Sequence, residues 1–291
     1  MHSHGSRPHA PVGAALMRVV ELPVVTGDGH GAALLARIPE APRSALLWLP
    51  ALGVAAKHYL PFADALAARG IAVFLHEWRG NGSSDRRAGS RCDWGYRELF
   101  ADIAASERAM ETHATGLPRI LGGHSLGGQL ACCSLAMAPR SAGSLWLVAS
   151  GAPYWRSFPL PTRWWLPFAY RFLPWLANRC GALPGRRVGF GGNEARGVIR
   201  DWSRTALGGR YAAAGMDFDF ERALATVDVD ARAVVMANDW LAPTGSLRFL
   251  LGKMPATHAR IETLDAIAPG VRADHFGWLK APEAVVDALL G

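Results

Sequence analysis

Short, mainly apolar runs alternate along the chain with longer segments of helical periodicity. The apolar runs predict buried strands at 45–49, 71–75, 119–121, 144–148, 232–236 and 260–264. The segments between and after them predict helices at 59–69, 96–113, 125–138, 246–251 and 282–290. Strands that alternate with helices over short loops are typical of an α/β fold, with a mainly parallel sheet covered on both faces.

The start of the chain has a different pattern. Two β-rich runs at 17–25 and 31–38 predict a hairpin around Thr26-Gly27-Asp28-Gly29. Residues 1–16 contain three histidines and two prolines but no long apolar stretch, so we expect a flexible tail before Met17. No run of about twenty apolar residues occurs, so no transmembrane helix is expected.

The alternation stops between residues 152 and 226. This interval is rich in Trp, Arg and Pro and is mostly helical in pattern. We expect it to form an inserted helical cap over the carboxyl edge of the sheet. The core domain would then consist of residues 17–151 and 227–291.

Charge is concentrated in the same interval. The chain of 291 residues carries a net charge of +7, and residues 152–211 hold ten arginines against Glu194 and Asp201. Such an excess fits an anionic substrate, an anionic membrane surface or nucleic acid. Nucleic acid is disfavoured because the chain has no zinc-finger spacing, no RNA-binding signature and no long Lys/Arg run.

The four cysteines, Cys92, Cys132, Cys133 and Cys180, form no CxxC pair with metal spacing. They are expected to be buried free thiols of a reducing compartment, which predicts a cytoplasmic protein.

The sequence Gly123-His124-Ser125-Leu126-Gly127 matches G-x-S-x-G, the pattern of a nucleophile elbow. An apolar strand is expected before it and an apolar helix after it, as the motif requires. Its glycines permit a tight turn that exposes the serine hydroxyl and directs a helix N-terminus toward a developing oxyanion. The alternative is a glycine-rich turn whose serine only caps a helix. The context favours Ser125 as a nucleophile.

With this motif, five other segments resemble the α/β-hydrolase superfamily over nearly the whole chain after Met17. They are Pro50-Ala51-Leu52-Gly53-Val54, Arg79-Gly80-Asn81-Gly82-Ser83-Ser84, Asp93-Trp94-Gly95, Asp239-Trp240-Leu241-Ala242-Pro243 and His275-Phe276-Gly277. More narrowly, the chain resembles a bacterial branch of predicted serine hydrolases, distantly similar to the lysophospholipase and serine aminopeptidase groups. The resemblance implies an α/β-hydrolase fold.

Two segments depart from this family's pattern. Pro50-Ala51 stands where the family usually has His-Gly at the oxyanion loop. The family's common Asp before Arg-Gly is replaced, since the local sequence is Glu77-Trp78-Arg79.

A serine hydroxyl needs a base, and the superfamily's chain order is nucleophile, acid, histidine. Of the ten histidines, only His258 and His275 follow the cap. His258 begins a predicted strand and should point into a face of the sheet. His275 follows the last strand, in a loop at the carboxyl edge, and is predicted to be the base.

The acid must hold the imidazole in its useful tautomer. Asp239 comes just after the predicted strand 232–236, whereas Asp228 and Asp230 precede that strand and lie at the wrong edge of the sheet. Asp274 adjoins the histidine, but neighbouring side chains rarely bond each other in that geometry. We therefore predict Asp239 as the acid.

The oxyanion donors should be backbone N–H groups, one from Leu126 and one from the loop after strand 45–49. In that loop Leu52 is favoured, with Gly53 next. A backbone donor does not depend on side-chain identity, so Pro50-Ala51 is compatible with activity. His124 is interpreted as structural, with a side chain that diverges from the nucleophile.

Nine aromatic residues lie between Tyr154 and Trp175, and those at 164, 168, 172 and 175 share one helical face. This face could pack the cap on the core. It could instead form an apolar acyl pocket over Ser125, whose substrate contacts would be Trp155, Trp164, Trp165 and Phe168. Interleaved with arginines at 163, 171 and 179, it also resembles an interfacial amphipathic helix that touches a membrane surface.

The leading hypothesis is a serine hydrolase that cleaves a carboxylic ester of an apolar or lipid-like substrate through an acyl-enzyme. No metal or organic cofactor is implied. Acyl transfer, thioester cleavage and amide cleavage use the same triad and stay open. A catalytically silent binding protein of this fold is the alternative from another class.

Overall fold

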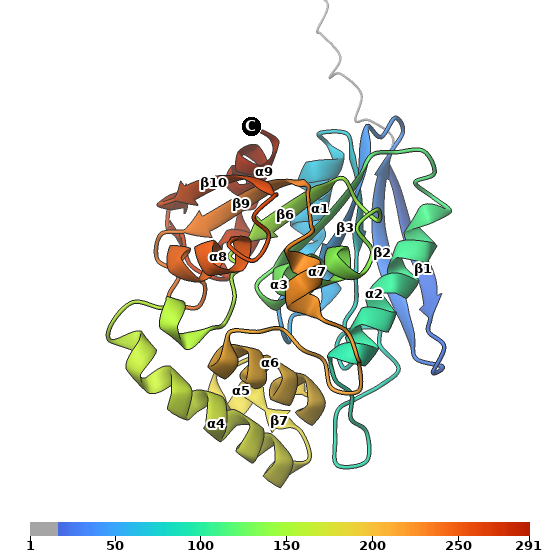
Figure 1. Ribbon diagram of the computed structural model, residues 1–291. Helices are drawn as coiled ribbons and strands as arrows, with labels where there is room; N and C mark the ends of the chain where they lie inside the picture. Colours follow the sequence, from blue (N-terminus) through green and yellow to red (C-terminus); the bar gives the residue numbers. More distant parts are fainter. Residues whose placement is uncertain (1–16) are drawn as a thin grey trace, which may run out of the picture.

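A single eight-stranded sheet organises the chain in the computed structural model, which describes residues 17–291 (Figure 1). The tail expected at residues 1–16 therefore lies outside the described residues. The strand order is β1-β2-β4-β3-β5-β6-β9-β10. The bounds are β1 Met17–Val25, β2 Gly31–Pro39, β3 Ser44–Leu49, β4 Ile71–Leu75, β5 Arg119–His124, β6 Ser144–Val148, β9 Asp230–Met236 and β10 His258–Leu264.

The sheet is mainly parallel, as the sequence pattern predicts. Strands β4, β3, β5, β6, β9 and β10 each run parallel to their neighbours within this group. Only β2 is antiparallel to both of its partners, β1 and β4. The expected hairpin is confirmed, and the chain has the α/β-hydrolase fold class.

One central strand is longer than its sequence pattern predicts. β5 was expected to end at residue 121 but continues to His124, so Gly122 and Gly123 are strand residues. A Cβ at Gly122 would lie 2.9 Å from the carbonyl oxygen of Trp146 and 3.1 Å from the ring of Trp48. The glycine therefore makes room for two large neighbours and does not break the strand.

Helices cover both faces of the sheet because successive strand residues point to opposite sides. In β3, Leu47 and Leu49 join one buried cluster with residues of α2, α3, α7 and α8, whereas Leu46 and Trp48 join the other with α1 and α9. The bounds are α1 Leu60–Ala67, α2 Tyr96–Glu111, α3 Leu126–Met137, α7 Phe220–Leu224, α8 Thr244–Leu251 and α9 Glu283–Leu290. Short 3-10 helices occupy Ala56–Tyr59, Trp155–Ser157 and Gly277–Lys280.

A mostly helical layer is inserted between β6 and β9 and lies below the sheet in Figure 1, with α4 along its outer side. Its elements are α4 Thr162–Cys180, β7 Leu183–Pro184, α5 Gly185–Val188, β8 Asn193–Glu194 and α6 Arg196–Gly208. α4 packs on α6, where the rings of Tyr170 and Trp202 meet edge to face at 5.0 Å. α7 instead packs on the core, since Phe220 stacks on Phe100 of α2 at 5.3 Å.

β11 (Ala266–Ala268) and β12 (Val271–Arg272) form a small hairpin just before His275. Across residues 17–291, none of the helices combines the length and the hydropathy needed to cross a bilayer.

All four cysteines are free, but only Cys132 and Cys133 are fully buried. Cys180 is exposed at the end of α4, so the expectation of burial is wrong for that residue.

Candidate active site

Ser125 lies at a sharp turn between β5 and α3. Its backbone has φ 55° and ψ −120°, a conformation that a residue with a side chain adopts only under strain. A Cβ at Gly127 would lie 2.0 Å from the carbonyl oxygen of Leu49, so a glycine is needed for the turn to approach the end of β3. The Ser125 side chain makes no capping hydrogen bond to α3, which argues against the helix-cap alternative.

Ser150, which sequence reasoning did not single out, holds this turn. Its Oγ donates to the backbone carbonyl of Ser125 at 2.7 Å, from the loop after β6. The same hydroxyl would be 2.4 Å from a Cβ at Gly128, so the loop and the turn are tightly packed. A serine after a strand is too common for its sequence to signal this role.

His275 and Asp239 form a buried pair at the carboxyl edge of the sheet. His275 Nδ1 is 2.7 Å from Asp239 Oδ2, and each residue is 6% exposed. The other carboxylate oxygen accepts the backbone N–H groups of Leu241 and Ala242 at 2.8 and 3.0 Å. These donors fix the carboxylate and leave one oxygen for the imidazole.

The competing residues lie elsewhere. Asp274 accepts the backbone N–H groups of Phe276 and Gly277 and does not bond the imidazole. His258 begins the edge strand β10, as expected, but its side chain is exposed to solvent. Asp228 and Asp230 lie at the start of β9, at the far end of that strand from Asp239.

His124 contacts His275, although its side chain was expected to diverge from the site. Its ring centroid is 4.8 Å from that of His275, and its Nδ1 is 2.8 Å from the Tyr59 hydroxyl. The same hydroxyl accepts the Ala51 N–H at 2.9 Å, so Tyr59 links the ring to the loop after β3. Burial, and then the nearby His275, hold the pKa of His124 well below its usual range. A neutral ring thus packs against His275.

The two departures from the family pattern meet in the structure. Trp78 Nε1 donates to the carbonyl oxygen of Pro50 at 2.8 Å, which ties the loop after β3 to the loop after β4. Glu77 accepts the backbone N–H groups of Ala56 and Ser83, so it holds the residues on either side. This alternative set of bonds fixes the loop that contains Leu52.

The predicted oxyanion donors line the same cleft as Ser125. Leu52 and Leu126 both line it, together with Ser125 and His275. Within residues 17–291, neither backbone N–H of this pair has a protein acceptor. Two unpaired donors beside a serine hydroxyl form a site that can stabilise an oxyanion.

The cleft has a volume of about 920 Å³, including the space at its open mouth. Its walls are mostly apolar, and its aromatic lining residues are Phe158, Trp165, Tyr170, Phe190, Trp202, Trp240 and Phe276. Gln129 is a polar exception that the sequence reading missed. It is 4% exposed, and its Oε1 has no hydrogen-bond partner.

The predicted cap contacts are mostly wrong. Of the four aromatic residues expected to touch substrate, only Trp165 lines the cleft; Trp155, Trp164 and Phe168 do not. Trp164 and Phe168 are 71% and 74% exposed. The periodicity correctly grouped the rings on one helical face, but that face points to solvent, so it neither covers Ser125 nor packs the cap on the core.

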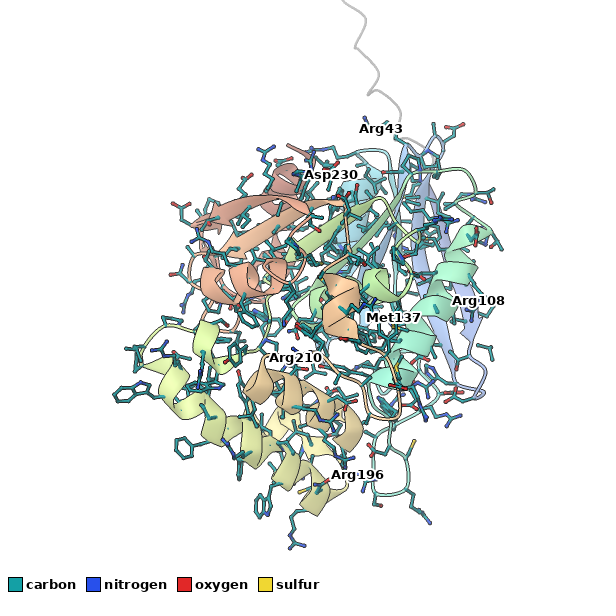
Figure 2. All side chains as sticks on the ribbon, viewed as in Figure 1. Arg43, Arg108, Met137, Arg196, Arg210 and Asp230 are labelled. Atoms are coloured by element: carbon teal, nitrogen blue, oxygen red, sulfur yellow. The ribbon has the colours of Figure 1, made fainter. Side chains whose placement is uncertain are left out.

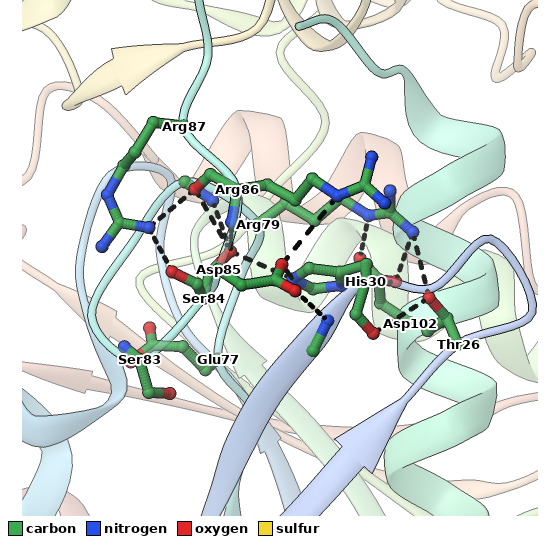
Figure 3. A network of polar contacts seen from close by, with 12 residues as sticks. Thr26, His30, Glu77, Arg79, Ser83, Ser84, Asp85, Arg86, Arg87 and Asp102 are labelled. Carbon is green, nitrogen blue, oxygen red and sulfur yellow. Dashed lines mark hydrogen bonds and ion pairs between the residues drawn. The ribbon is translucent and has the colours of Figure 1, made fainter.

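A second Ser-His-Asp arrangement lies away from the cleft (Figure 3). His30 is 3.0 Å from Ser84 Oγ and 3.2 Å from Asp102 Oδ1, but all three residues are buried. Arg79 donates to Asp102 at 2.6 Å, and Ser84 Oγ accepts the Gly80 N–H. This network fastens the loop after β4 to the β1–β2 hairpin and has no place for a substrate.

The described residues contain no cluster of three or more His, Cys, Asp or Glu side chains that could hold a metal ion. The arrangement at the cleft instead provides a strained serine, a histidine–carboxylate pair and two free backbone donors. This combination can perform nucleophilic acyl chemistry.

The fold and this site define the chain as an α/β-hydrolase. The model of the family described as "Serine aminopeptidase, S33" matches residues 40–203, more than half of the chain, and the chain belongs to this family. A search of curated proteins found no significant match.

Solved structures share the fold at low identity. A hydrolase from Pseudomonas aeruginosa PA01 is 20% identical, with a TM-score of 0.58 over 96% of this chain and 98% of that one. An esterase from Exiguobacterium antarcticum is 16% identical, with a TM-score of 0.61 over 93% and 98%. The thioesterase domain from the curacin biosynthetic pathway is 17% identical, with a TM-score of 0.61 over 94% and 100%. The neighbours thus include both oxygen-ester and thioester hydrolases.

Proposed function

We propose that the protein is a serine hydrolase that cleaves carboxylic esters with an apolar acyl group through an acyl-enzyme. The observation that carries the proposal is the convergence on one cleft of Ser125, the His275–Asp239 pair and the free N–H groups of Leu52 and Leu126. Family membership and the esterase neighbours support ester hydrolysis as the reaction class.

In the proposed reaction, Ser125 Oγ attacks the ester carbonyl carbon while His275 Nε2 takes its proton. Asp239 holds the Nδ1–H and stabilises the imidazolium. The carbonyl oxygen becomes an oxyanion that accepts the two backbone N–H groups. The alcohol then leaves with the proton from His275, and water repeats the sequence on the acyl-enzyme to release the acid.

The walls of the cleft support an apolar acyl group. Each buried CH₂ contributes about 0.8 kcal/mol, so a chain that fills these walls gains affinity with length. Peptide substrates with a free amino terminus fit less well, because no carboxylate is among the cleft-lining residues in the described chain to pair with the ammonium group. Thioesters and acyl transfer share the same chemistry and differ in leaving group and acceptor.

A fluorophosphonate probe tests the proposal, since it labels only an activated serine. Labelling of the wild type and its loss in Ser125→Ala are expected, with turnover of any accepted ester reduced by up to about 10⁶ in the variant. Ser90→Ala is the matched control, because Ser90 is exposed and does not line the cleft, and it should still be labelled. A Ser125→Ala variant that is folded and retains most activity would remove the triad assignment.

Acyl chain length then tests the substrate class. From acetyl to octanoyl esters of one alcohol, kcat/KM should rise, by roughly 50-fold for three methylenes if all are buried. A flat or falling series would contradict the apolar acyl site while leaving the nucleophile assigned.

A further inference from the structure

The outer face of α4 carries a ridge of exposed rings. Trp164, Phe168, Phe172 and Trp175 are 71%, 74%, 49% and 57% exposed. At about 100° per residue they lie within an arc of roughly 80°, and we call them the aromatic ridge. The opposite face of the helix is buried. Figure 2 shows side chains of α4 projecting away from the body of the molecule. Contiguous exposed apolar surface of this kind marks an interaction site.

The charge around the ridge has one sign. Among residues 152–211 the charged side chains are ten arginines and two acids, and both acids, Glu194 and Asp201, are buried. By the same angle, Arg171 and Arg179 fall within or beside the ridge, whereas Arg163 lies about 100° from Trp164, toward the inner side of the helix. In the described part of the chain none of these three arginines forms a salt bridge; Arg171 donates to the carbonyl of Pro167 in its own helix.

The ridge also adjoins the mouth of the cleft. On the inner side of α4, Leu166, Tyr170 and Leu173 form part of the cleft wall. Between the two faces, Trp165 pairs with Trp240 at 6.0 Å, and the two rings are 44% and 56% exposed at the rim. One helix therefore separates the substrate cleft from the exposed ridge.

We propose that the aromatic ridge and its arginines bind the surface of an anionic phospholipid membrane. The rings would enter the boundary between headgroups and acyl chains, and the guanidinium groups would pair with lipid phosphates. The arginines and the buried inner face keep α4 in the plane of the interface. The cleft mouth then opens beside the lipid, so an apolar substrate reaches Ser125 with little exposure to water.

Vesicle co-sedimentation of the full chain tests this directly. The probes are vesicles of phosphatidylcholine alone and vesicles with about one third phosphatidylglycerol. Binding to the anionic vesicles is expected, and it should weaken as salt rises from about 0.1 M to about 1 M, because the Debye length falls from about 10 Å to about 3 Å. The Ser125→Ala background is used throughout, so the result does not depend on the proposed hydrolysis.

Two variants separate the contributions of rings and charge. Arg171→Gln/Arg179→Gln should weaken binding about 20- to 30-fold, and Trp164→Ser/Phe168→Ser/Phe172→Ser about 100-fold or more. The charge-matched control is Arg108→Gln/Arg140→Gln, with Arg108 on α2 (Figure 2), and it should bind nearly as wild type apart from a small nonspecific loss.

Three outcomes would overturn the proposal. The wild type could fail to bind anionic vesicles at low salt, or the ridge variant could bind as well as the wild type. Light scattering could instead show that the ridge variant converts a dimer into a monomer without any vesicle binding, which would make the ridge an interface between copies. Active-site labelling of the ridge variant, in a chain that retains Ser125, should be unchanged and verifies its folding.

Discussion

The core and the inserted layer use apolar residues in opposite ways. In the core, apolar runs such as β3 and β4 are almost completely buried. In α4 the largest rings face solvent, while Leu166, Tyr170 and Leu173 are buried. The comparison teaches that periodicity identifies which residues share a helical face but does not tell which face is packed.

The largest expected effect tests the core. Asp239→Asn should lower kcat by about 10⁴-fold with little change in stability, because the amide keeps the shape but favours the wrong imidazole tautomer. Steady-state kinetics with one soluble ester measures it. Asp274→Asn is the matched control, since Asp274 bonds nearby backbone groups and the exposed Arg272 but not the imidazole. If the two variants exchange these outcomes, Asp274 is the acid.

Glu194, in β8 of the inserted layer, lies against the core loop that contains Leu52. Its Oε1 would be 2.8 Å from a Cβ at Gly53, the neighbour of Leu52, and it accepts the Gly192 N–H at 2.7 Å. Burial raises the pKa of Glu194 from 4.5 to about 7. The folded state thus holds this proton more tightly than the unfolded state, and the free energy of unfolding falls between pH 4.5 and 7.

Glu194→Gln should remove this fall in the free energy of unfolding, because the amide does not titrate. Its oxygen can still accept the Gly192 N–H. We expect the variant to be more stable than the wild type by up to about 3 kcal/mol at pH 8, and by almost nothing at pH 4. Urea unfolding at the two pH values measures the difference. An equal effect at both pH values would show that Glu194 does not titrate in this range.

Two adjacent tryptophans sharpen the comparison within α4 itself. Trp165 lines the cleft and Trp164 does not. Trp165→Ala should lower kcat/KM for an octanoyl ester about tenfold more than for an acetyl ester. Trp164→Ala should leave both values unchanged when the esters are soluble. A chain-length effect in Trp164→Ala would place the exposed face in the substrate path.

Gln129 carries the smallest expected effect. Since its Oε1 is buried without a partner, Gln129→Leu should raise the free energy of unfolding by about 1 kcal/mol, a Tm increase of a few degrees. Gln129→Glu should instead destabilise the protein, because it buries a charge without a partner. Thermal unfolding of both variants measures the sign. A loss of stability in Gln129→Leu would mean that the amide is hydrogen-bonded.

Local pattern was sufficient for most of the core. Mainly apolar runs located the strands, and the G-x-S-x-G turn, with an acid after one strand and a histidine after another, predicted Ser125, Asp239 and His275 as the site. The structure joins the last two at 2.7 Å. These residues could be found because parallel strands all end at the same edge, so chain order alone restricts which loops can meet.

Other features depended on contacts between distant segments. Three of them need a partner that sequence spacing does not reveal. They are the extension of β5 through Gly122, the contact of His124 with His275 and the bond from Trp78 to Pro50.

The sequence by itself determined the fold class, the sharp turn at Ser125 and the grouping of rings on one face of α4, because each follows from local backbone geometry and residue periodicity. Only the tertiary structure decided that Trp165 enters the cleft while Trp164 and Phe168 face solvent. The rotation of a helix about its axis is set by what the rest of the fold offers for packing. Here Tyr170 packs edge to face on Trp202 of α6, and that contact turns the aromatic ridge outward.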